Sequence, residues 1–115
     1  MSSTVAGLQI DVTGLRDLIA SGAPVAMLDV REPWEHELCQ IANSTLIPLS
    51  ELPARSRELQ ALGESEAPLV VICHHGGRSM QATLWLRQQG FENAINLAGG
   101  IDAWASTIDT SMRRY

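Results

Sequence analysis

The sequence of 115 residues contains no lysine, because all eight of its basic residues are arginine. A lysine Schiff base or a lysine general base is therefore excluded. Any cation in a functional site must be a guanidinium, which binds oxyanions as a planar fork. No apolar run approaches the roughly 18 residues of a membrane span, so we expect no transmembrane segment and no membrane partner.

Cysteine and positive charge are also scarce. The chain has two cysteines, Cys39 and Cys73, which are too few for a disulfide framework. Its first residues, MSSTVAGLQID, lack the features of a secretory signal, so we expect a cytoplasmic protein with both thiols reduced. The net charge is −5 and no basic run occurs, so we expect no nucleic-acid partner.

The hydrophobic content and the order of predicted elements indicate one α/β domain. Hydrophobic residues make up 45% of the chain, enough for one core, which we place at about residues 8–108 within a single domain 1–115. Short apolar runs predict strands at 8–10, 25–30, 46–47, 69–72 and 94–97. Amphipathic stretches predict a helix capped by Thr13 and ending at Gly22, and further helices at 31–38, 50–62, 79–89 and 100–108. This alternation is typical of a parallel sheet with helices on both faces.

The most informative segment is LVVICHHGGRSMQATLWL, at residues 69–86. A buried strand delivers Cys73 to its carboxyl end, where ligands bind in open α/β sheets. Gly76 and Gly77 let the following loop curl tightly, and a helix opening at Arg78 and Ser79 adds its positive dipole end. These features predict a cradle for one anion, with Cys73 held as a thiolate by loop amides and by the Arg78 guanidinium.

Two alternatives to this cradle remain open. A free cysteine at a strand end is often a small buried hydrophobe. The spacing Cys-x4-Arg between Cys73 and Arg78 also bears on the reaction. Cysteine-dependent phosphatases use Cys-x5-Arg, because their loop encircles a whole phosphate dianion. The shorter loop favours the outer sulfur of a persulfide, and leaves a phosphatase or arsenate reductase as the alternative.

Four motifs together resemble the single-domain rhodaneses, or sulfurtransferases. They are MLDVREPWE (27–35), LIPLSEL (46–52), VVICHHGGRS (70–79) and WLRQQGFENAINLAGGIDAW (85–104), in the family's order. The resemblance implies a five-stranded parallel sheet flanked by helices, with Cys73 as the sulfur carrier. It also implies that substrate is bound by the loop residues His74, His75, Gly76, Gly77, Arg78 and Ser79. The first half most resembles rhodanese domains attached to the sulfur-activating enzymes of molybdopterin synthesis.

The activity implied is transfer of sulfane sulfur from a donor such as thiosulfate to a thiophilic acceptor. The sulfur would travel as a persulfide on Cys73, without a cofactor. The expected partners are a small-molecule donor and acceptor, with a sulfur-carrier protein as a further candidate. The alternative is a persulfide carrier that binds partner proteins and has little turnover on free thiosulfate.

Asp29 and Arg31 leave the second predicted strand beside the proposed site. In the resemblance this pair either anchors neighbouring loops or lets Arg31 bind substrate, and we include Arg31 among the substrate-binding candidates. His74 and His75 titrate near neutral pH and offer acid–base help. We prefer to interpret them as exposed loop side chains, because sulfur transfer needs little proton chemistry once the thiolate is formed.

Residue types alone leave a zinc site as another candidate. His36, Cys39, Cys73 and His75 are suitable zinc ligands, but the two clusters fall at different points of the chain, and we expect no metal. Cys39 is either a resolving thiol for Cys73 or a packed structural thiol, and we favour the second. The three tryptophans are expected in core and rim packing.

Overall fold

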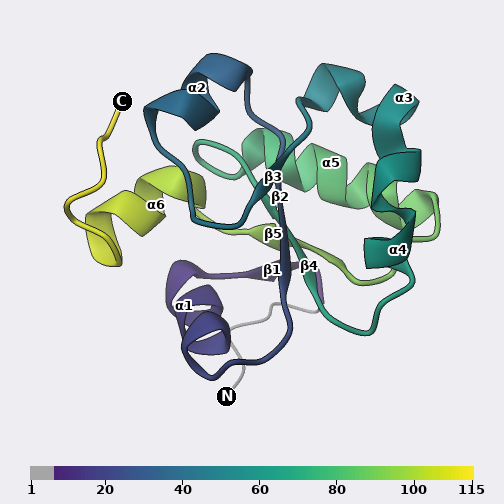
Figure 1. Ribbon diagram of the computed structural model, residues 1–115, viewed down its shortest axis with the longest axis horizontal. Coiled ribbons are helices and arrows are strands. Elements are labelled where there is room, and N and C mark those ends of the chain that lie inside the picture. Colours follow the sequence, from purple (N-terminus) through teal and green to yellow (C-terminus); the bar gives the residue numbers. More distant parts are fainter. Residues whose placement is uncertain (1–6) are drawn as a thin grey trace.

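The computed structural model describes residues 7–115 and contains one five-stranded sheet. Residues 1–6, which hold most of the segment inspected for a secretory signal, lie outside the described residues. The strands run in the order β1-β5-β4-β2-β3, and every neighbouring pair is parallel (Figure 1). They are β1 (Gln9–Ile10), β2 (Ala26–Asp29), β3 (Thr45–Leu46), β4 (Leu69–Ile72) and β5 (Ala94–Leu97). The predicted five-stranded parallel sheet is confirmed.

Helices cover both faces of this sheet, as predicted. They are α1 (Val12–Ala20), α2 (Pro33–Leu38), α3 (Leu52–Arg55), α4 (Gln60–Gly63), α5 (Gly77–Gln88) and α6 (Gly100–Thr107). Two 3-10 turns, η1 (Leu49–Glu51) and η2 (Ser56–Leu59), flank α3. In Figure 1, α1 and α6 lie on one side of the strands, and α3, α4 and α5 lie on the other.

The two faces bury separate cores, because successive side chains of a strand point to opposite faces. The core under α1 and α6 contains Leu15, Val70, Ile72, Leu97 and Ile101, together with Cys39. The core under α3 and α5 contains Leu52, Leu69, Val71 and Leu86, together with Cys73. The two cysteines of the chain therefore belong to opposite sides of the sheet.

Some predicted details of the helices are wrong, and the clearest cases are the following. Residues 50–62 form a series of short turns, since Pro53 cannot donate a helical hydrogen bond and 3-10 turns bend the segment. The cap of α1 is Asp11, whose carboxylate accepts from the N–H of Gly14 at 2.8 Å, and Thr13 only donates its hydroxyl to that carboxylate. Helix α5 begins at Gly77, two residues before the predicted start.

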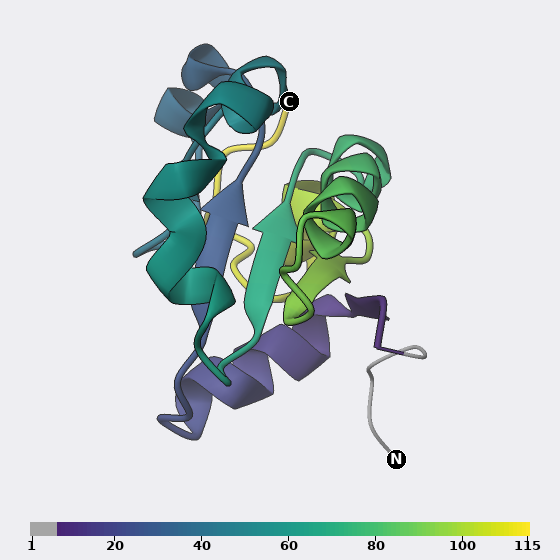
Figure 2. The same ribbon diagram turned by 90° about the vertical axis from the view of Figure 1, so that its right-hand side faces the viewer.

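The chain after α6 turns back toward α2, so that the C-terminal residues lie beside that helix in both views (Figures 1 and 2). This brings Tyr115 next to Glu35, which is 80 residues earlier in the sequence. Within residues 7–115, none of the helices combines the length and the apolar character needed to cross a bilayer.

Candidate active site

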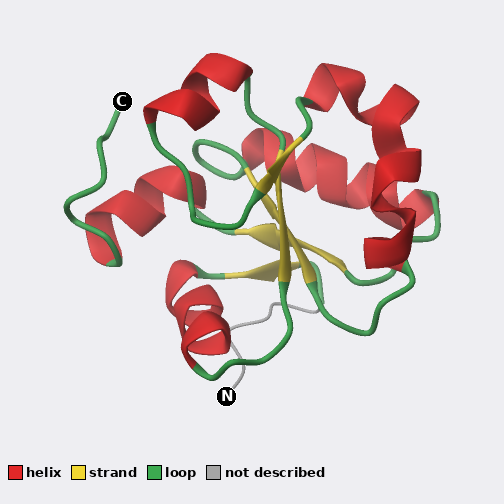
Figure 3. Cartoon of the chain, viewed as in Figure 1, coloured by secondary structure: helices red, strands yellow, loops and turns green. Residues whose placement is uncertain are grey.

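Cys73 directly follows β4, whose four residues are all buried. The residue is 1% exposed. The loop after it curls back beside the start of α5 (Figure 3). Two groups donate hydrogen bonds to its sulfur: the N–H of Gly76 at 3.1 Å and the hydroxyl of Ser79 at 3.2 Å. Gly76 adopts φ +110°, a backbone conformation that residues other than glycine rarely adopt.

The N-terminus of α6 shapes the same loop from behind. The N–H of Ile101 donates to the carbonyl of Cys73 at 2.9 Å, and that of Asp102 donates to the carbonyl of His74 at 3.0 Å. The C=O and N–H of a trans peptide point in opposite directions. Tying these two carbonyls to α6 therefore turns the N–H groups of His74 and His75 to the opposite side of the loop.

Gly100 makes this close approach possible. Its φ is +59°, and a Cβ at this position would stand 2.5 Å from the carbonyl oxygens of both Cys73 and His74. No side chain fits into that space without displacing backbone. The double glycine at the start of α6 is thus part of the candidate site, although it lies more than 20 residues after the cysteine.

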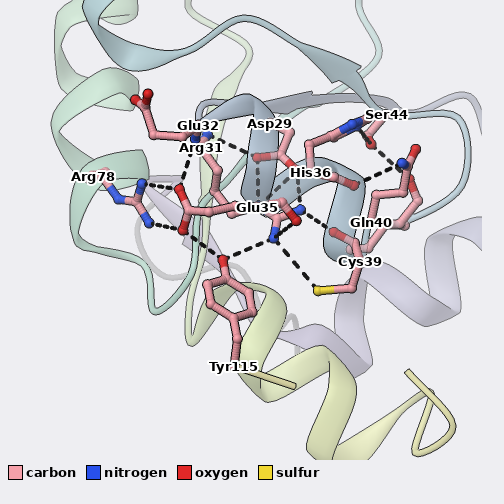
Figure 4. A network of polar contacts seen from close by, with 11 residues as sticks. Asp29, Arg31, Glu32, Glu35, His36, Cys39, Gln40, Ser44, Arg78 and Tyr115 are labelled. Carbon is pink, nitrogen blue, oxygen red and sulfur yellow. Dashed lines mark hydrogen bonds and ion pairs between the residues drawn. The ribbon is translucent and has the colours of Figure 1, made fainter. Parts of the chain in front are cut away.

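Arg78 binds a carboxylate of the protein itself. Its two terminal nitrogens donate to the two oxygens of Glu35 on α2, at 2.7 and 2.8 Å (Figure 4). These hydrogen bonds are the main reason why the pKa of Glu35 falls to about 2, despite the opposing effect of burial. The fork of Arg78 is thus occupied by Glu35, so the predicted help of this guanidinium in holding the Cys73 thiolate would act through space. The main cause that raises the pKa of the Arg78 guanidinium is its hydrogen bonding to Glu35, and a coulombic interaction with Cys73 acts in the same direction.

Arg31 is fully buried and has no surface left for a substrate. Two of its nitrogens bind the carboxylate of Asp29 at 2.7–3.1 Å. Nη2, one of these two, also donates to the carbonyl oxygen of Cys39, and Nη1 donates to the carbonyl oxygen of Glu35 and the hydroxyl of Tyr115 (Figure 4). The structure thus corrects the prediction of Arg31 as a substrate-binding residue, and supports the alternative in which it anchors neighbouring loops.

Tyr115 joins the two ion pairs and was not predicted. Its hydroxyl donates to Glu35 at 2.7 Å and accepts from Arg31 at 3.0 Å. Its ring stacks on His74 with the centroids 3.8 Å apart and meets the edge of Trp34 at 5.6 Å. Burial is the main reason why the pKa of Tyr115 rises to about 12, so the hydroxyl keeps its proton at neutral pH. The sequence carries no signal for these contacts, because they join the last residue described to a helix far away in the chain.

The two loop histidines differ in environment. His74 is sandwiched between Tyr115 and His75, and its burial lowers its pKa, which keeps the imidazole neutral. His75 is exposed, with a ring nitrogen 3.8 Å from the carboxylate of Asp102. The interpretation of both as exposed side chains therefore holds for His75 and is wrong for His74. Gly77 is exposed and opens α5.

The metal-ligating side chains that the structure brings together are not the four zinc candidates of the sequence. The ligand atoms of His74, His75 and Asp102 lie within 4.8 Å of one another. The carboxylate of Asp102 also binds Arg114 at 3.0 Å, so a cation there would compete with a guanidinium.

Cys39 is buried, and its sulfur accepts from Arg31, which favours the structural thiol over the resolving thiol. Trp104 packs in the core as expected, whereas Trp34 is 61% exposed.

Ser79 and Asn96 form a buried polar pair beside the sulfur. The hydroxyl oxygen of Ser79 lies within hydrogen-bond distance of both the side-chain carbonyl of Asn96 and the sulfur of Cys73. Asn96 lies in β5, whose other three residues are apolar and buried. Sequence reasoning missed Asn96, although an amide inside a short buried strand is a signal that could have found it, because buried polar groups need partners.

Comparison with known proteins agrees with this geometry. The model of the Rhodanese-like domain family matches residues 11–107. A sulfurtransferase of Allochromatium vinosum is 34% identical, over 84% of this chain and 87% of that protein. The human single-domain sulfurtransferase TSTD1 superposes with a TM-score of 0.70 at 32% identity, covering 93% of this chain and 98% of that chain.

Other relatives are much longer. The adenylyltransferase and sulfurtransferase MOCS3-2 of Zea mays is 38% identical over 87% of this chain, which spans 21% of that protein. The chain likewise spans 30% of a rhodanese-like/PpiC domain-containing protein of Arabidopsis thaliana. The family model covers most of the sequence, and a sulfurtransferase matches it over most of both lengths. The chain therefore belongs to the rhodanese-like domain family of sulfurtransferases.

Proposed function

We propose that the chain transfers sulfane sulfur as a persulfide on Cys73, with thiosulfate as a donor. The observation that carries this proposal is the pair of donors, Gly76 N–H and Ser79 hydroxyl, directed at a cysteine sulfur where a parallel strand ends. Such donors stabilise a thiolate and a persulfide anion in the way an oxyanion hole stabilises an oxyanion. Membership in a sulfurtransferase family supports the same reaction class.

The reaction has two steps. The Cys73 thiolate attacks the outer sulfur of thiosulfate. The sulfur–sulfur bond of the donor breaks, and sulfite leaves with the bonding electron pair. An acceptor nucleophile, such as cyanide or a thiolate, then attacks the terminal sulfur of the persulfide and restores the Cys73 thiolate. No electrons are gained or lost overall, so the chemistry needs no cofactor.

We further propose that a sulfur-carrier protein is a candidate acceptor. The support is the likeness to the rhodanese-like part of proteins named adenylyltransferase and sulfurtransferase. A carrier would have to present its reacting group to a sulfur that is 1% exposed. We therefore expect a slender chain end, rather than a folded surface, to approach Cys73.

The direct test is mass spectrometry of the protein after incubation with thiosulfate and removal of the excess. We expect a gain of one sulfur atom, located on the peptide that contains Cys73 and lost again on addition of cyanide. Cys73→Ser should show no gain and no turnover, because a hydroxyl cannot carry a persulfide. Cys39→Ser is the matched control, and it should keep both the added sulfur and the turnover.

Three results would contradict the proposal. They are sulfur retained by Cys73→Ser, sulfur located on Cys39, and hydrolysis of an aryl phosphate at a rate comparable to sulfur transfer. The last result would favour the phosphatase alternative, for which the loop between Cys73 and Arg78 is one residue short.

A further inference from the structure

A row of hydrogen-bonded side chains leads from the sheet edge to the candidate nucleophile. The side-chain amide of Asn96 donates to the side-chain oxygen of Gln9 at 3.3 Å, and its carbonyl accepts from Ser79. Ser79 in turn lies 3.2 Å from the sulfur of Cys73. Asn96, Ser79 and Cys73 are all buried. The row is thus sheltered from water along most of its length.

The sheet register explains why this row exists. Gln9 of β1 pairs directly with Asn96 of β5, so the two side chains stand next to each other on one face. Asn96 also pairs with Val71 of β4, whose side chain belongs to the same core as Cys73. Ser79 lies in the first turn of α5, above that face.

The hydrogen bonds of this row depend on whether Cys73 is a thiol or a thiolate. The hydroxyl of Ser79 has one proton but two acceptors, the sulfur of Cys73 and the carbonyl of Asn96. With Cys73 as a thiol, its own proton can go to the Ser79 oxygen while Ser79 donates to Asn96. With Cys73 as a thiolate, Ser79 must donate to the sulfur, which leaves the Asn96 carbonyl without that donor.

A half-turn of the Asn96 amide resolves this conflict. The amide oxygen and nitrogen then exchange places with almost no change in shape. The nitrogen of Asn96 then donates to the Ser79 oxygen. The Gln9 amide, whose oxygen accepts from Asn96 in the structure, has to turn as well, so that its nitrogen donates to the Asn96 oxygen. Every donor in the row now points toward the sulfur, and aligned hydrogen bonds of this kind strengthen one another in a medium of low dielectric.

We propose that Asn96 is a positioning residue that acts through Ser79, and that its amide, backed by Gln9, aligns the row to favour the thiolate of Cys73. The inference depends on the proposed function only in taking Cys73 as the reacting group. It concerns the thiolate and not the sulfur donor, so it can be tested without any transfer reaction.

The test is the pH dependence of Cys73 alkylation by iodoacetamide, measured in a Cys39→Ser background where Cys73 is the only thiol. In Asn96→Asp the carboxylate can only accept, so it retains the Ser79 proton. We expect the midpoint of the profile to rise by about one pH unit, which is about a tenfold lower rate on the acid side. Asn43→Asp adds the same charge at an exposed position, and should leave the midpoint unchanged.

A double-mutant cycle separates the row from a simple effect of charge. Ser79→Ala removes the link, so adding Asn96→Asp to it should raise the midpoint no further. The surrounding charged and titratable groups are unchanged in every variant: Arg78 of α5, Glu35 of α2, Asp102 of α6, and His74 and His75 of the loop. An unshifted midpoint in Asn96→Asp, or shifts that add in the double variant, would overturn the proposal.

Gln9→Leu provides a second measurement if Asn96→Asp fails to fold. It removes only the last donor of the row, so the midpoint should rise by a smaller amount, with Gln60→Leu as an exposed control. An unchanged midpoint in Gln9→Leu would overturn the proposal. Sulfur loading by thiosulfate, measured in parallel, shows independently whether the proposed function itself holds.

Discussion

Four charged side chains around the site form two ion pairs, Asp29–Arg31 and Glu35–Arg78, and Tyr115 bridges them. Three of the four are almost completely buried. A buried charge is tolerated only when its partners remain in place, because removing one partner leaves the other without compensation. The pairs therefore fix where α2 stands relative to the start of α5.

Arg31→Lys tests the structural role of this guanidinium. A lysine keeps the charge but not the fork, so several buried hydrogen bonds are lost. We expect the free energy of unfolding, measured in urea, to fall by more than about 2 kcal/mol. The folded variant should keep kcat/KM for thiosulfate within about threefold of the wild type, a barrier change of less than about 1 kcal/mol.

Arg16→Lys is the matched control, because Arg16 pairs with Asp17 at the surface, and it should change neither quantity. A large loss of kcat/KM with unchanged stability in Arg31→Lys would return Arg31 to the substrate-binding set.

Residues whose roles are local were predictable. Cys73 and Gly76 were found because strand, cysteine, glycine and helix follow one another within a few positions. Glu35 and Tyr115 were not found, since their roles arise from contacts between segments that are far apart in the chain. The ion pair between Arg78 and Glu35 was not predicted either, because it joins residues that are 43 positions apart.

At the scale of elements, the loop after β4 is shaped jointly by α5 and α6. Helix α5 supplies Ser79, and α6 binds the carbonyls of Cys73 and His74. The contact with α6 depends on Gly100, where a Cβ would meet two carbonyl oxygens at 2.5 Å.

We therefore predict that Gly100→Ala disables the site through the backbone. The added methyl group has to displace the loop, so kcat/KM for sulfur transfer should fall at least about tenfold, which is about 1.4 kcal/mol. Gly22→Ala is the control, because Gly22 also has a positive φ, +77°, but its Cβ would meet nothing within 4 Å. Both variants should lose stability, and only Gly100→Ala should lose activity in the folded protein. Equal activity losses in both would show that the loop contact is unimportant.

The boundaries of helices and strands were predictable where the sequence pattern is compatible with only one type of element. Strands β4 and β5 match the expected residues, because four consecutive buried residues stand between turn signals. Residues 50–62 were not predictable, since their apolar spacing fits a helix equally well.

At the scale of the whole molecule, the site lies where both cores and three helices meet, so stability and site geometry respond to the same charges. The pKa of Glu35 is lowered from 4.5 to about 2 in the folded protein. A carboxyl with a depressed pKa stabilises the fold above its unfolded pKa, and this contribution is lost as the pH falls toward the folded value. Stability should therefore decline between about pH 4.5 and about pH 2.

Urea unfolding at a series of pH values measures this decline. The pKa of His74 is also lowered, so protonation of this histidine in the unfolded state reduces stability as the pH falls. This second decline begins at a higher pH, near the unfolded value of 6.5. Glu35→Gln should flatten the dependence below about pH 4.5 and leave the part near pH 6 unchanged. Glu58→Gln is the exposed control, because its ion pair with Arg55 lies at the surface. A slope below pH 4.5 that is the same in Glu35→Gln and the wild type would contradict the assignment.

The placement of the two cysteines in opposite cores has a consequence for oxidative damage. If peroxide converts Cys73 to a sulfenic acid, the other cysteine of the sequence packs in the opposite core with its sulfur against Arg31, so we expect no internal disulfide to rescue it. Recovery must then come from a thiol of another molecule that can reach the loop. The route by which a sulfur acceptor enters would therefore also be the route of repair.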